Sequence, residues 1–85
     1  MSKRNNFKLQ VALSYKPLWK LLVDKDLLKQ DLRQQAQLSS TSMARLNNGE
    51  NIQTDTLLRI CQVLDCQIGH IAEVIPATDT KEDNA

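Results

Sequence analysis

The residues best suited to a chemical task are a run of short polar side chains followed by an arginine. Hydroxyl residues occupy positions 39–42, and Arg45 follows soon after. Met43 and Leu46 recur at helical spacing, so a helix through this segment would turn them inward and expose the polar side chains. Such a helix suits the major groove of DNA, where side chains must reach base edges. Its outward face would consist of Ser40, Thr41, Ala44 and Arg45. The same pattern also fits a solvated helix in an ordinary five-helix bundle.

A second group of reactive side chains comprises Cys61, Cys66 and His70. Their spacing lacks a fourth ligand and the tight cysteine pair of a structural zinc site, so we expect no metal and no cofactor. The single histidine has no acidic or nucleophilic partner at a suggestive spacing, so we expect no enzymatic activity. Both cysteines are expected to be free thiols that pack as small apolar side chains. Redox sensing is an alternative role for them, although buried thiols are usually inert.

Length and composition favour one small helical domain. The chain has 85 residues, 41% hydrophobic and 25% charged, with only two glycines and two prolines, which is little turn material for an all-β fold. No apolar run is long enough to span a membrane or to form a signal peptide, so a cytoplasmic location is expected.

The charge is divided unevenly along the chain. Residues 1–49 hold nine basic and three acidic side chains, whereas residues 50–85 hold two basic and seven acidic ones. Such asymmetry suggests a region that binds a polyanion beside an acidic tail.

The apolar spacing predicts five helices. The first runs from Pro17 to about Lys25, the second covers 29–36, the third starts after the N-cap Ser39 and ends at Asn47-Asn48-Gly49, the fourth starts at Thr54, and a short fifth covers 67–72. The inward faces of the first, second and fourth helices would carry Tyr15, Leu18, Trp19, Leu22, Leu28, Leu32, Ala36, Leu57, Ile60, Cys61 and Leu64.

Two further segments suggest short strands. Apolar residues alternate from Leu9 to Tyr15, and a second apolar run covers 71–75 before Pro76. Each is too short to be stable alone, so they would pair within one chain or across a dimer. The predicted organisation is a flexible arm over 1–8, a helix-turn-helix domain over 9–76 and a disordered acidic tail over 77–85.

Residues 13–76 resemble the Cro/CI-type helix-turn-helix domains, also called the XRE family, and especially its small stand-alone regulators. The family core reads Leu, spacer, Gly-Val-Ser, two variable residues, Thr-Ile-Ser-Arg-Leu, two residues and Gly. In this sequence the core is matched by Leu32, a spacer and residues 37–49. Segments 15–22 and 57–69 look like its first helix and its last two helices. The resemblance implies an all-α, five-helix, lambda-repressor-like domain that binds double-stranded DNA.

Three positions depart from the family pattern. Gln37 replaces the turn glycine and would have to adopt a left-handed conformation, Leu28 replaces the Ser or Thr that caps the second helix, and His70 replaces an acid. Carried over by position, the family's base contacts fall on Ser40, Thr41, Ala44 and Arg45, and its phosphate contacts fall on Lys29, Ser42, Asn48 and Asn51.

The function that these features indicate is a homodimeric repressor on an operator with two half-sites. The dimer surface would be the Leu9–Leu13 strand or the 71–75 segment. The alternative is a protein-interaction module, an antitoxin or adaptor, that uses the same fold to bind a protein partner.

Overall fold

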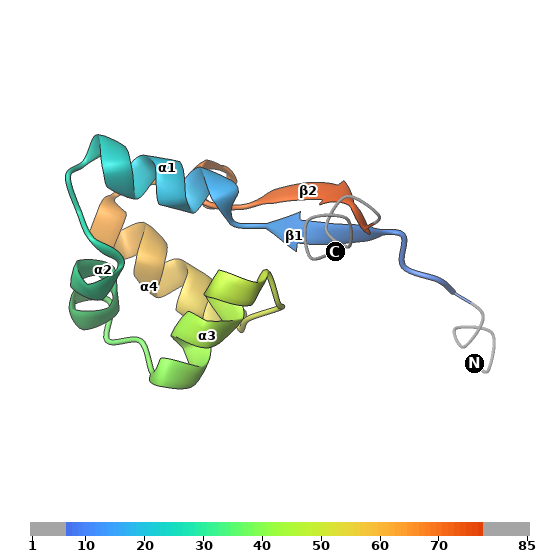
Figure 1. Cartoon of the computed structure of the whole chain (residues 1–85), viewed down its shortest axis with the longest axis horizontal. Helices are drawn as coiled ribbons and strands as arrows, with labels where there is room; N and C mark the ends of the chain where they lie inside the picture. Colours follow the sequence, from blue (N-terminus) through green and yellow to red (C-terminus); the bar gives the residue numbers. More distant parts are fainter. Residues whose placement is uncertain (1–6, 78–85) are drawn as a thin grey trace.

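The computed structural model describes residues 7–77, and within them a helical body carries a narrow two-stranded ribbon (Figure 1). The body contains α1 (Lys16–Asp24), α2 (Lys29–Gln35), α3 (Ser40–Asn48) and α4 (Thr54–Leu64), followed by the 3-10 turn η2 (Ile68–His70). The ribbon consists of β1 (Val11–Ser14) and β2 (Glu73–Pro76). The all-α class is confirmed. Residues 1–6 and 78–85, which hold most of the predicted arm and tail, lie outside the described part of the chain.

The predicted fifth helix over 67–72 is wrong in extent, because η2 covers only three residues. Gly69 weakens a helix here, and the chain must turn at once to enter β2. Ile71 and Ala72, which follow η2, are buried in the core instead of lying on a helix face.

The two strands pair with each other within one chain. They are antiparallel, with Val11 opposite Pro76 and Leu13 opposite Val74. This pairing decides between the two arrangements that the sequence left open for these segments. The strand begins at Val11, later than the alternation suggested, and the Leu9 side chain is 69% exposed.

The core lies between the four helices and η2. Its buried apolar residues are Tyr15, Leu18, Leu22, Leu32, Ala36, Leu38, Met43, Leu46, Ile60, Cys61, Leu64, Ile71 and Ala72. Trp19 and Leu57 are only partly buried and pack against this cluster.

Leu28 is wrongly predicted as a core residue, because its side chain is 69% exposed. It is the N-cap residue of α2 and has an extended backbone, so helical periodicity does not apply to it. The preceding Leu27 packs against the core in its place. The Leu28 N–H is still satisfied, because it donates to the Asp31 carboxylate at 2.9 Å.

None of the helices within residues 7–77 is both long and apolar enough to cross a membrane.

Candidate nucleic-acid interface

The third helix has the two faces that its sequence predicts. The Ser39 hydroxyl caps its start by accepting a hydrogen bond from the Ser42 N–H at 3.0 Å. Gly49 ends it with a left-handed backbone, at φ +72°. Met43 and Leu46 are buried. The side chains of Ser40, Thr41, Ala44 and Arg45 are exposed, so one surface of α3 carries every residue predicted to contact bases.

Arg45 is the most extended of these side chains and the best suited to reach a base. Its side chain has neither a hydrogen bond nor an ion pair with another residue in the range 7–77. The guanidinium can therefore present its donors to guanine without first breaking a contact within the described fold.

The turn between α2 and α3 contains a left-handed residue, as predicted from the presence of Gln37 in place of the family's turn glycine. Gln37 is left-handed, at φ +56°, and the next N–H, that of Leu38, donates back to the Arg33 carbonyl at 2.9 Å. Non-glycine residues adopt this region at a cost, because Cβ crowds the backbone. The turn is therefore strained relative to one that contains glycine.

An arginine of α4 forms a hydrogen bond with the backbone of this turn. The Arg59 guanidinium donates to the Gln37 carbonyl oxygen at 3.1 Å, and it is itself paired with Asp55 at 2.9 Å. Sequence reasoning missed this contact. The i, i+4 spacing of Asp55 and Arg59 predicts the ion pair within α4, but nothing in the sequence indicates that the arginine reaches the turn.

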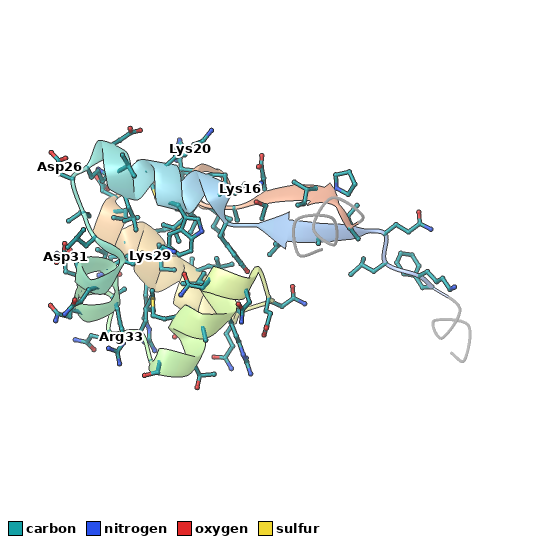
Figure 2. All side chains as sticks on the ribbon, viewed as in Figure 1. Lys16, Lys20, Asp26, Lys29, Asp31 and Arg33 are labelled. Carbon is teal, nitrogen blue, oxygen red and sulfur yellow. The ribbon has the colours of Figure 1, made fainter. Side chains whose placement is uncertain are left out.

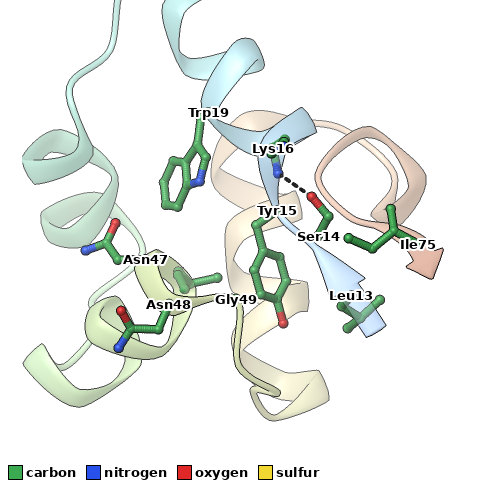
Figure 3. A pocket seen from close by; sticks show the side chains of 10 residues that line it. Leu13, Ser14, Tyr15, Lys16, Trp19, Asn47, Asn48, Gly49 and Ile75 are labelled. Atoms are coloured by element: carbon green, nitrogen blue, oxygen red, sulfur yellow. Dashed lines mark hydrogen bonds between the residues drawn. The ribbon is translucent and has the colours of Figure 1, made fainter. Parts of the chain in front are cut away.

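Lys29, predicted to contact phosphate, lies at the start of α2 and contacts side chains of both α1 and α3. Its ammonium donates to the Asn47 side-chain oxygen at 2.8 Å and lies 4.0 Å from the centre of the Trp19 ring. Trp19 and Asn47 line the same pocket of about 240 Å³ between α1 and the end of α3 (Figure 3). Lys29 thus links α1, α2 and α3. An ammonium has three N–H donors, so this arrangement leaves donors for a phosphate.

Arg33 is a basic residue at this surface that the site prediction did not include. Its guanidinium donates to the Ser40 hydroxyl oxygen at 3.1 Å, so its charge lies beside the first turn of α3 (Figure 2). The sequence places Arg33 only on the outward side of the second helix. Its proximity to Ser40 depends on the angle at the turn, which no local pattern reveals.

The remaining predicted phosphate contacts differ in their surroundings. Ser42 is partly buried, and its side-chain oxygen accepts a hydrogen bond from the Ser39 hydroxyl at 3.2 Å. The Asn48 amide donates to the Glu50 carboxylate at 3.4 Å, whereas Asn51 is exposed on the loop after α3. A carboxylate beside Asn48 repels a phosphate, so Asn51 is the better suited of the two asparagines.

The described residues contain no group of three or more His, Cys, Asp or Glu side chains arranged to hold a metal ion.

Two short helices joined by a tight left-handed turn, with the second helix capped and polar on its outer face, define a helix-turn-helix. The family model of the Cro/C1-type HTH DNA-binding domain matches residues 17–77, and the chain belongs to that family. A solved structure described as the transcriptional regulator VanUg is 38% identical, with a TM-score of 0.80 over 82% of this chain and 93% of that chain. None of the curated proteins compared with the chain matches it. The chain is thus a DNA-binding protein of the kind that regulates transcription.

Proposed function

We propose that the protein is a sequence-specific repressor that binds, as a homodimer, an operator with two half-sites. The observation that carries the proposal is the exposed face of α3, where Arg45 stands beside short side chains that allow close approach to base edges. Arg33 and Lys29 flank this face and supply positive charge for the DNA backbone.

The proposed contacts divide into two sets. Base edges are contacted by Ser40, Thr41, Ala44 and Arg45. Phosphates are contacted by Lys29, Ser42, Asn48 and Asn51, to which the structure leads us to add Arg33. Because the hydroxyl side chains are short and discriminate weakly, most of the specificity depends on Arg45, which can bind guanine through two parallel hydrogen bonds.

The ribbon supports dimerisation. Residues that pair across the ribbon lie on one face, so Val11, Val74 and Pro76 share an apolar face with the half-buried Leu13. Phe7 and Leu9 come just before β1 in the chain. Phe7, Leu9 and Val74 are each more than 60% exposed. A two-stranded ribbon with such a face is marginal in water, and a second copy would cover it.

Binding to a random duplex library, followed by a salt series on the selected sequence, tests the proposal. Arg45→Ala should relax preference at one base position, a loss of about 1–3 kcal/mol of discrimination. Lys29→Ala should weaken binding to all sequences and reduce the slope of log K against log salt by about 1. Lys20→Ala is the matched control, because Lys20 is an exposed lysine on the side of α1 away from α3 (Figure 2).

Uniform loss of affinity in both the Arg45 and the Lys29 variants would remove Arg45 as a base contact. Binding that does not respond to salt would contradict the DNA-binding interface itself, since phosphate contacts release counterions. The absence of a mobility shift with the protein's own upstream DNA, together with co-purification of a neighbouring gene product, would instead favour the protein-interaction alternative.

A further inference from the structure

The end of α4 brings two cysteines together. Asp65 has a left-handed backbone, at φ +53°, and the Cys66 N–H donates across it to the Cys61 carbonyl oxygen at 3.0 Å. This six-residue closure is the hydrogen bond of a Schellman motif, in which the side chains at the two bonded positions usually pack against each other. Both of those positions are cysteine here, and both cysteines are free.

The two thiols differ in exposure and influence one another. Cys61 is buried and belongs to the core, whereas Cys66 is only partly buried. Burial raises the pKa of the Cys66 thiol, and the neighbouring Cys61 raises that pKa further by charge repulsion and through a side-chain hydrogen bond.

We propose that Cys61 and Cys66 form a redox-modification site, a dithiol that closes to an intramolecular disulfide when a low-molecular-weight disulfide is the oxidant. The inference is independent of the proposed function, since neither cysteine lies on α3. A disulfide needs Cα atoms about 4.4–6.8 Å apart, and the backbone hydrogen bond from the Cys66 N–H to the Cys61 carbonyl oxygen holds these two residues next to each other in the fold.

The exchange proceeds in two steps that balance. The Cys66 thiolate, at the more exposed position, attacks one sulfur of the small disulfide, forms a mixed disulfide and releases one small thiol. The Cys61 thiol then loses its proton and its sulfur attacks that of Cys66, which releases the second small thiol. Overall, two protein thiols are oxidised to one disulfide, the small disulfide is reduced to two thiols, and the two thiol protons of the protein pass to the leaving groups.

The test is a thiol–disulfide equilibrium in buffers of reduced and oxidised glutathione, with the products alkylated and weighed by mass spectrometry. If the fold holds the pair ready to react, the equilibrium constant for the intramolecular disulfide should be at least about tenfold larger in native buffer than in denaturant, where the same two thiols are held only by the chain. An equal or smaller native constant would overturn the proposal. So would accumulation of a mixed glutathione disulfide at Cys66 with Cys61 still reduced.

Two matched variants separate local geometry from general stability. Asp65→Val places a β-branched residue at the left-handed position and should lower the native constant toward the denatured value, with both thiols still present. Asp26→Val introduces the same change at another left-handed aspartate, at φ +58° after α1, and should leave the constant unchanged. Equal loss in the two variants would show that the constant follows global stability and would refute the local site.

Discussion

Replacing Gln37 with glycine relieves the backbone strain in the turn between α2 and α3 without removing any hydrogen bond within the described structure. Gln37 has φ +56°, its side chain is exposed, and its contact with Arg59 is made by the backbone carbonyl, which glycine also has. The substitution therefore changes the backbone preference of one residue and little else in the folded state.

The expected gain follows from two opposing terms. Holding a non-glycine residue in the left-handed region costs roughly 1–2 kcal/mol. Glycine is more flexible in the unfolded chain, which costs about 0.5–1 kcal/mol on folding. We expect Gln37→Gly to raise the free energy of unfolding by about 0.5–1 kcal/mol, which for a domain of this size is a rise in Tm of a few degrees.

Urea denaturation followed by circular dichroism measures this difference, and a thermal scan checks it. Gln34→Gly is the matched control, because Gln34 is an exposed glutamine in the helical conformation of α2, where glycine should lower stability by up to ~1 kcal/mol. The reasoning is refuted if Gln37→Gly is neutral or destabilising, since the left-handed turn would then carry no strain.

Two further predictions concern buried and half-buried side chains. Lys29→Ala removes the ammonium from the face of the Trp19 ring, so it should change the fluorescence emission of this single tryptophan. The same loss should lower the free energy of unfolding by about 0.5–1 kcal/mol. An unchanged emission spectrum would contradict the contact. Burial raises the pKa of both Tyr15 and Cys66, so the unfolded chain loses these two protons more readily than the folded chain does. The free energy of unfolding should therefore be constant near neutral pH and fall above about pH 8.5. Urea titrations across this range check it, and in a Tyr15→Phe variant the part of the decline near pH 10 should disappear.

The parts of the site that the sequence reveals are those set by local signals. Ser39 predicts where α3 begins because a hydroxyl satisfies the first free N–H groups, and Gly49 predicts where it ends because it adopts a left-handed backbone. Between these caps, the spacing of Met43 and Leu46 is sufficient to orient the exposed face. Hence α3, its limits and the side chains on its surface were predictable from the residues themselves.

The features that the sequence does not reveal depend on distances between elements. Arg59 reaches Gln37 across 22 positions, and Lys29 reaches Asn47 across 18. Both contacts require the angles between helices, which apolar spacing leaves undetermined. The error at Leu28 has a different, local cause, because periodicity cannot tell the last residue before a helix from the first residue within it.

These contacts change how the role of Lys29 must be established. If Lys29 both contacts phosphate and holds α3 through Asn47, then Lys29→Ala removes a charge and a tether at once. Asn47→Ala removes only the tether and keeps the charge. A reduced salt slope in the lysine variant alone would assign the phosphate contact, because only loss of charge changes counterion release. A loss of base preference shared by both variants would show that the tether fixes the position of α3, and through it the position of Arg45 over its base.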